Sequence, residues 1–135
     1  MGLKNIQPGE LPALALAYIG DAVYELAVRY HLVNSGIARV NRLHDEAVKF
    51  VQAKAQARLL RELEGLLTEE ETAVIRRGRN AKSPHTPRST GVIDYRQSTA
   101  FECLIGYLYL KGDKDRLEEI LALALEMGRD LERGK

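Results

Sequence analysis

The sequence contains one cysteine, no tryptophan and no long apolar run. Because a lone cysteine cannot form an internal disulfide, we expect a chain that works in a reducing compartment, the cytoplasm. No stretch reaches the roughly 20 apolar residues that a membrane-spanning helix needs, so no membrane association is expected. Residues 1–10 also lack the basic-then-apolar layout of a secretory signal. We expect the 135 residues to form one domain with a substantial core.

Acidic residues are missing from one part of the chain. None occurs between Glu71 and Asp94, although the net charge of the whole sequence is only +1. Helical periodicity also fails from about Arg79 to Arg96, so we predict a flexible basic loop over residues 79–96. A loop of that length in a compact domain usually has a function. Basic residues make this part of a nearly neutral molecule locally positive; they are Arg76, Arg77, Arg79, Lys82 and Arg88.

Outside that loop the pattern is helical. Apolar residues recur at helical spacing and no segment alternates as a strand does, so an all-α fold is predicted. Thr68 and Glu71 form the expected capping box of the fourth helix, and Gly78 is its expected stop. The expected helices span residues 12–34, 38–51, 52–66, 68–78, 97–110 and 113–129.

In the first helix, apolar residues at alternating intervals of four and three predict the face that packs on the core. A second face, about 200–280° around the helix from Ile19, carries Asp21, Glu25 and Arg29. The simplest interpretation of this second face is a solvated surface with an i,i+4 pair between Glu25 and Arg29. The predicted core-facing stripe consists of Ile19, Val23, Leu26, Tyr30 and Val33.

Two carboxylates stand inside apolar helical segments. Asp21 follows Gly20, and a glycine inside a helix costs roughly 0.5–1 kcal/mol relative to alanine. Glu102 is flanked by Phe101 and Cys103, with no adjacent base to pair with it. An acid among apolar residues needs a partner or a cation. Two such acids on separate helices suit a hard divalent cation.

The segments around these acids resemble the ribonuclease III catalytic domain. Their order and spacing extend the likeness from about Pro12 to Leu125. The sequence is more similar to Mini-ribonuclease III, the short bacterial form that lacks a double-stranded-RNA-binding domain. The matching segments are Gly20-Asp21-Ala22-Val23 followed by Glu25, LHDEAVKFVQAKAQ from Leu43 to Gln56, RRGRNAKS from Arg76 to Ser83, and Phe101-Glu102 followed by Ile105-Gly106.

The resemblance implies the helical arrangement of the ribonuclease III endonuclease domain, with Asp21 and Glu102 as catalytic residues that hold Mg²⁺. The family pattern has further acids where this sequence has Leu14, Ala17 and Thr99. Their absence argues against a four-carboxylate cage. We therefore expect a two-acid site that is completed by water and RNA and that binds Mg²⁺ weakly.

The same resemblance implies a double-stranded RNA substrate, which proteins recognise through its backbone and 2′-hydroxyl groups. The alternative for the basic loop is a solvated connector. One active site cuts one strand, so double-strand cleavage implies a symmetric homodimer. Tyr18 stands where relatives place an apolar dimer contact. The candidate RNA-binding residues are Arg76, Arg77, Arg79, Asn80 and Lys82.

The implied activity is Mg²⁺-dependent endonucleolytic cleavage in the maturation of the ends of 23S ribosomal RNA. It leaves 5′-phosphate and 3′-hydroxyl ends, and a ribosomal protein is a further candidate partner. The alternative is a catalytically silent module of the same fold that binds structured RNA or a ribosomal component, which the three missing acids favour. A third alternative is a helical protein-interaction module without an RNA role, and the acid-free basic segment counts against it.

Overall fold

The computed structural model of the protein describes residues 6–82 and 91–133, with side chains as far as Arg129. These two segments are almost entirely helical and contain no strand, so the predicted all-α fold is confirmed. The elements in chain order are η1 (Pro8–Glu10), α1 (Ala13–Asn34), α2 (Val40–Val51), α3 (Ala53–Leu63), η2 (Glu64–Leu66), α4 (Glu69–Asn80), α5 (Val92–Lys111) and α6 (Lys114–Arg133).

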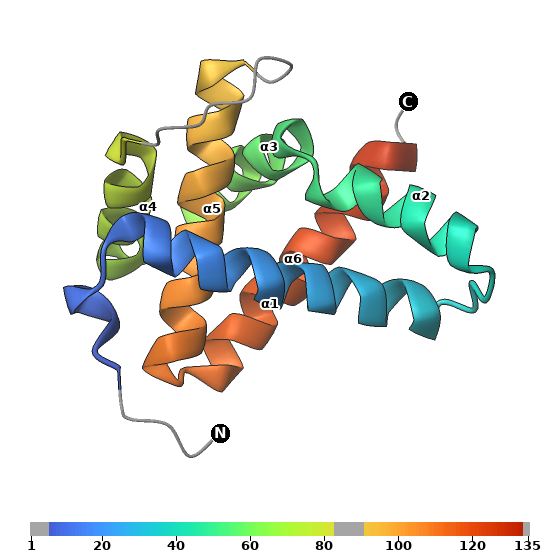
Figure 1. Cartoon of the computed structure of the whole chain (residues 1–135), viewed down its shortest axis with the longest axis horizontal. Helices are drawn as coiled ribbons and strands as arrows, with labels where there is room; N and C mark the ends of the chain where they lie inside the picture. Colours follow the sequence, from blue (N-terminus) through green and yellow to red (C-terminus); the bar gives the residue numbers. More distant parts are fainter. Residues whose placement is uncertain (1–5, 83–90, 134–135) are drawn as a thin grey trace.

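Helix α5 is the central element of the fold. It packs most extensively against α1, α4 and α3, and Figure 1 shows it crossing α1 at a steep angle. Phe101, Leu104 and Ile105 in its middle are completely buried. The ring of Tyr24 from α1 meets the ring of Phe101 edge to face, with centroids 4.9 Å apart. A helix that is apolar all round is the type expected at such a position.

Two glycines allow α1 and α5 to touch backbone to backbone where they cross. A Cβ atom on Gly20 would lie 1.8 Å from the carbonyl oxygen of Glu102, and one on Gly106 would lie 2.0 Å from that of Leu16. Both distances are far inside van der Waals contact, so a larger residue at either position would separate the helices. The packing gained by this close approach offsets the cost of about 0.5–1 kcal/mol that a glycine carries inside a helix.

Helix α4 is longer than predicted. It continues to Asn80, so Gly78 lies inside the helix and does not stop it. A Cβ atom on Gly78 would lie 2.8 Å from Cα of Ala100 in α5 and 2.8 Å from Sγ of Cys103. This glycine is therefore a position of close helix packing, which sequence periodicity does not distinguish from a helix stop.

Helix α5 also begins earlier than predicted, at Val92. The predicted loop over 79–96 is therefore too long at both ends, because residues 79–80 belong to α4 and 92–96 belong to α5. Val92 and Ile93 are 53% and 73% exposed, so the first turn of α5 has no buried apolar stripe from which the start of the helix could be predicted. Residues 83–90, which include part of the predicted loop, lie outside the described residues.

Helix α1 has the predicted bounds, but the predicted core-facing stripe is wrong. Leu26, Tyr30 and Val33 are 70%, 72% and 60% exposed. Because α1 carries apolar residues on two faces, periodicity could not tell which face is covered. In spite of its apolar character, neither α1 nor another helix in the described segments could cross a membrane. The buried face consists of Leu16, Ala17, Gly20, Tyr24, Val28 and Leu32.

Candidate active site

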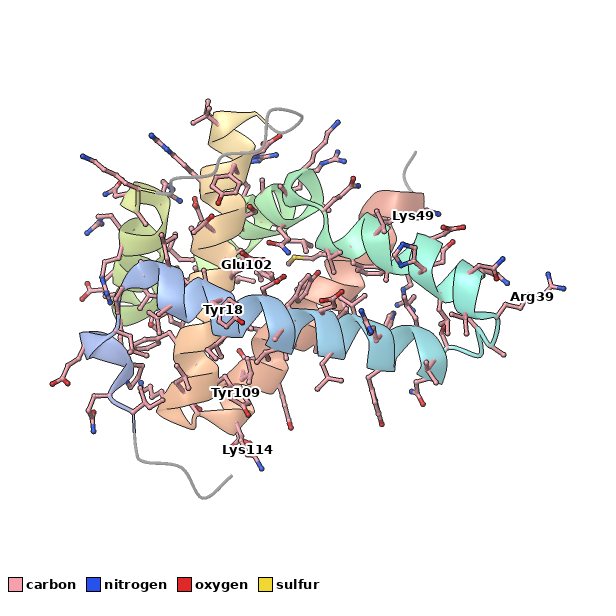
Figure 2. The ribbon with its side chains drawn as sticks, in the orientation of Figure 1. Tyr18, Arg39, Lys49, Glu102, Tyr109 and Lys114 are labelled. Carbon is pink, nitrogen blue, oxygen red and sulfur yellow. The ribbon has the colours of Figure 1, made fainter. Side chains whose placement is uncertain are left out.

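The crossing of α1 and α5 brings the two predicted carboxylates together. Asp21 follows Gly20 on α1, and Glu102 is the residue whose backbone that glycine touches. Asp21 is exposed and Glu102 is half-buried. Their side chains are in hydrogen-bond contact. Figure 2 shows Glu102 beside α1 at this crossing, so two residues far apart in the sequence form one site.

The environment of Glu102 disfavours its ionised form. Burial is the largest cause and raises the pKa of Glu102 to about 8, with further contributions from the charge of Asp21 and the hydrogen bond between the two groups. A hydrogen bond from Gln56 acts in the opposite direction. A carboxyl group with such a pKa keeps its proton at neutral pH unless a positive charge replaces it. The pair is therefore a place where a cation is favoured.

The side chains at this pair fit a hard divalent cation. Mg²⁺ usually takes one or two protein carboxylates and fills its remaining positions with water or substrate phosphate. Within residues 6–82 and 91–129, no cluster of three or more histidine, cysteine, aspartate or glutamate side chains is placed to hold a metal. The arrangement that this part of the chain offers is thus a site with two acids, Asp21 and Glu102.

The positions where the family pattern has further acids supply no carboxylate. Leu14 is half-buried and Ala17 is buried in α1. Thr99 is buried in α5, and its hydroxyl donates a hydrogen bond of 3.0 Å to the backbone oxygen of Tyr95. The Thr99 hydroxyl thus serves its own helix. A metal site with two acids therefore stays a prediction.

The other charged residues on the second face of α1 have an ordinary surface role. Glu25 and Arg29 form an ion pair of 3.0 Å, as predicted, and both side chains are well exposed. Exposed pairs at i,i+4 contribute only about 0.3–0.5 kcal/mol. We therefore assign this pair to the surface of α1.

The five candidate RNA-binding residues do not share one setting. Arg76, Asn80 and Lys82 are exposed at the C-terminal end of α4 and just beyond it. Arg77 is exposed as well, but its guanidinium donates a hydrogen bond of 2.6 Å to the backbone oxygen of Leu11. Four of the five are thus presented to solvent on α4 or directly after it, and one of them, Arg77, also ties α4 to the segment before α1.

Arg79 is held by two elements. Its Nε donates to Oε1 of Gln97 at 2.9 Å, and its Nη2 donates to Oε1 of Glu64 at 2.6 Å. The contact with Glu64 is also an ion pair, which neutralises part of the positive charge. Arg79 therefore joins α4 to α5 and η2 in addition to any role at an RNA surface.

An apolar groove follows the open face of α1. It is bordered by α1, the C-terminal end of α5 and α6, and its volume is about 1220 Å³. Four of the five residues of the predicted core stripe line it. Contiguous exposed apolar surfaces mark interaction sites in many proteins. The α1 lining includes Ile19, Val23, Leu26 and Tyr30, and the α6 lining includes Leu117 and Leu121.

Tyr18, the predicted dimer contact, is 81% exposed. Figure 2 shows its ring on the outer side of α1, close to the crossing with α5. It precedes Ile19, which lines the groove. Tyr18 therefore lies between the carboxylate pair and the apolar groove.

Sequence reasoning missed one residue of the site, Gln56 on α3. It is 1% exposed and its amide contacts Glu102. Its position three and four residues before the buried Leu59 and Leu60 was the available signal, because a polar residue there interrupts an apolar stripe.

Comparison with known proteins agrees with this fold. The family model described as Ribonuclease III domain matches residues 14–113. A Mini-ribonuclease 3 of Symbiobacterium thermophilum is 50% identical over 133 residues, which is 98% of this chain and 100% of that protein. A Mini-ribonuclease 3 of Brevibacillus brevis is 51% identical over 111 residues, which is 82% of this chain and 83% of that protein.

A crystal structure of a Fusobacterium nucleatum protein has a TM-score of 0.78 and 29% identity, covering 87% of this chain and 93% of that one. With these matches, the chain belongs to the ribonuclease III family and is an endoribonuclease. Within that family its relatives at about half identity are Mini-ribonuclease 3 proteins, which confirms the resemblance seen in the sequence.

Proposed function

We propose that this endoribonuclease requires Mg²⁺, cleaves double-stranded RNA and acts in the cytoplasm on the ends of precursor 23S ribosomal RNA, leaving 5′-phosphate and 3′-hydroxyl products. The observation that carries the proposal is the contact between Asp21 and Glu102 at the crossing of α1 and α5. Paired carboxylates that hold a divalent cation are suited to phosphodiester hydrolysis. The membership in a family of ribonucleases supports RNA as the substrate.

Each of the two acids has a distinct part in this proposal. Asp21, exposed beside the crossing, presents its charge to solvent and substrate. Glu102, whose pKa is raised, would release its proton to solvent on binding the cation, so that both groups would be ionised when they hold the ion. Asp21 and Glu102 would hold the Mg²⁺ ion, which would supply Lewis-acid activation of the phosphodiester and of an attacking water. The protein contributes the fixed separation of the two carboxylates.

The exposed part of the basic surface on α4 is proposed to bind the RNA backbone. Arg76, Asn80 and Lys82 are free of the intramolecular contacts that hold Arg77 and Arg79 in the described residues. Each phosphate that a basic side chain neutralises releases counterions from the RNA. Arg77 and Arg79 remain in the proposed binding set, with their charges partly engaged in the fold.

We further propose that the protein works as a homodimer that buries the groove of α1. The groove is apolar, and Leu26 and Tyr30 in it are 70% and 72% exposed in the single chain. A symmetric pair of chains would cover both copies of this surface and bring two sites to one duplex. Tyr18, on the outer side of α1, is the proposed contact at the edge of that interface.

A silent RNA-binding module remains the second candidate. The observation that favours it is the absence of carboxylates at Leu14, Ala17 and Thr99. Such a module would bind structured RNA or a ribosomal component, such as a ribosomal protein, without cleaving RNA.

A Mg²⁺ titration of cleavage on an end-labelled RNA duplex tests both candidates. Single-stranded RNA and a DNA duplex of the same sequence are the controls. We expect Mg²⁺-dependent cleavage of the RNA duplex alone, with half-maximal rate at millimolar Mg²⁺. Duplex binding without cleavage at every Mg²⁺ concentration would instead support the silent module.

A further inference from the structure

Gln56 is a buried amide beside the carboxylate pair and has no part in the proposed reaction so far. It lies in the first half of α3 and is 1% exposed. Glutamine is mostly a surface residue, and a buried amide normally has hydrogen-bond partners at both ends. The residues that share its side of α3, Leu59, Leu60 and Leu63, are core leucines. An apolar residue would therefore fit this position, and the polar one requires an explanation.

One contact fixes the direction of the amide. Its Nε2 donates a hydrogen bond of 3.0 Å to the backbone oxygen of Val51. Because a carbonyl oxygen can only accept, the nitrogen of Gln56 must face Val51, and the amide cannot be turned round. Val51 is the last residue of α2, so this bond also satisfies a carbonyl that the end of that helix leaves free.

The other atoms of the amide concern Glu102. The nitrogen of Gln56 has a second proton, and the interaction of this side chain with the Glu102 carboxyl group lowers the pKa of that group, which favours the ionised form. The amide oxygen is buried and has no hydrogen-bond partner within the segments that the structure describes. Leaving a buried acceptor unpaired is unfavourable. An unpaired buried oxygen next to a carboxylate pair indicates that something other than protein completes it.

We propose that Gln56 is a positioning residue of the metal site. Its amide nitrogen orients Glu102 towards the ion. Its unpaired oxygen is a neutral hydrogen-bond acceptor that is used when the ion is bound. The inference rests on the proposed function, because it requires that Asp21 and Glu102 hold the ion. It explains how Glu102 is held in place in a site with only two acids, because a neutral side chain orients it where other sites would use additional carboxylates. The competing explanation is that Gln56 only braces α2 against α3.

Metal binding to the RNA-free protein separates these explanations. Mn²⁺, whose binding is followed directly by electron paramagnetic resonance, is the probe, and thermal unfolding without metal is measured in parallel. Gln56→Met removes the amide at similar volume, and Gln52→Met changes an exposed glutamine four residues earlier as the control. We expect Gln56→Met to weaken Mn²⁺ binding about 10-fold or more, the usual effect of losing a partner of a metal ligand. Gln52→Met should leave it unchanged.

The contrary result is equally clear. If Gln56→Met unfolds at a lower temperature but binds Mn²⁺ as tightly as the wild type, Gln56 is a brace between α2 and α3 and the inference is overturned.

Gln56→Glu provides a second arm with the opposite sign, which decides the matter if Gln56→Met does not fold. A third carboxylate beside Asp21 and Glu102 should repel them in the metal-free protein and bind the cation with them. We therefore expect a lower unfolding temperature without metal and a larger rise on adding Mn²⁺ than in the wild type. An equal Mn²⁺-induced rise in both proteins would show that position 56 does not act on the site.

Asp21→Asn distinguishes failure of this inference from failure of the proposed function. If Asp21→Asn abolishes Mn²⁺ binding and Gln56→Met does not affect it, only the role of Gln56 is wrong. If Mn²⁺ binding survives Asp21→Asn, the ion is held elsewhere, and both the proposed metal site and the inference that rests on it are overturned.

Discussion

The two faces of α1 are similarly apolar, yet only one of them is covered. The inward face meets α5 through Gly20 and the fully buried Tyr24 and Val28. The outward face exposes more than two thirds of Leu26 and Tyr30. An apolar face indicates only that the helix has a surface to bury against a partner. Small residues at a crossing decide which of the two faces another helix of the same chain can approach.

The strongest way to break the inward face is Gly20→Ala. Its Cβ atom would lie 1.8 Å from the backbone oxygen of Glu102, so α1 and α5 must separate. We expect a loss of more than about 3 kcal/mol in the free energy of unfolding, or failure to fold, because backbone atoms cannot move aside as a side chain can. Chemical denaturation measures it. Gly65→Ala, where a Cβ atom meets nothing within 4 Å, is the control and should behave as the wild type.

Asp21→Asn and Glu102→Gln leave both faces of α1 intact and remove one charge from the site between the two helices. We expect single-turnover cleavage to fall by about 10³-fold or more, because several kcal/mol of metal-dependent stabilisation is lost. Circular dichroism and duplex binding should remain close to those of the wild type. A variant that keeps a nearly normal rate at saturating Mg²⁺ would disprove the two-acid site.

Leu26→Glu tests the outward face. Leu26 is 70% exposed in the single chain, so the fold should tolerate the charge. In a symmetric dimer the same charge would be buried twice without a partner, and we expect the dimer dissociation constant to rise about 100-fold or more. Tyr18→Glu, at the edge of the groove, should have a smaller effect in the same direction. Sedimentation analysis measures both.

Val40→Glu is the matched control for the groove, because Val40 is 79% exposed on α2 and does not line it. Its dimer constant should equal that of the wild type. A wild-type protein that is monomeric at micromolar concentration would contradict the proposed interface.

The ion pair between Glu71 and Arg116 lies away from the inward face of α1 and should make the free energy of unfolding depend on pH. The Arg116 guanidinium beside Glu71 lowers the pKa of that carboxyl group, and the side chain of Glu71 is 5% exposed. A depressed folded-state pKa contributes stability above the unfolded pKa of about 4.5, and this contribution is lost as the pH falls through the lower folded value.

Glu71→Gln should therefore lower the free energy of unfolding by about 2 kcal/mol at pH 7 and flatten its decline below pH 4.5. Glutamine can keep the capping-box bond to the backbone of Thr68, so the helix start is preserved. Urea unfolding at a series of pH values measures the effect. Parallel acid profiles for the two proteins would show that this ion pair is not responsible.

The smallest expected effect comes from the basic surface of α4, remote from both faces of α1. Replacing Arg76 and Lys82 together by alanine should reduce the slope of log affinity against log salt by somewhat under one for each lost phosphate contact. The cleavage rate at saturating RNA and low salt should persist. Arg39→Ala is the control, because Figure 2 places Arg39 at the opposite end of the molecule from α4. An unchanged slope in the double variant would indicate that this surface is solvated and makes no phosphate contacts with the RNA.

Local signals in the sequence predicted the helical elements well. The Thr68–Glu71 capping box is present with both of its hydrogen bonds, and α1 ends at Asn34 as expected. The contact of Asp21 with Glu102 follows from motifs whose order is typical of the family. The roles of these acids, the RNA-binding residues and Tyr18 remain predictions.

What could not be predicted depends on contacts between distant segments. Gly78 has the same chemistry whether it ends a helix or packs against Ala100, and only the position of α5 decides between the two. Likewise, the covered face of α1 follows from where Gly20 meets Gly106. Gln56 was missed because an amide in an apolar stripe carries no sign of which buried group it faces.

The glycine crossing of α1 and α5 also limits how far the distance between the two helices can change. Side-chain contacts yield by rotation about single bonds, but at Gly20 and Gly106 the helices rest on each other's peptide groups, which have no such freedom. The separation of Asp21 from Glu102 is therefore fixed by contacts between backbone atoms, which cannot adjust as side chains can. Variants selected for activity from a library randomised at positions 20 and 106 should return glycine at both, whereas neighbouring exposed positions such as Ala22 should accept many residues.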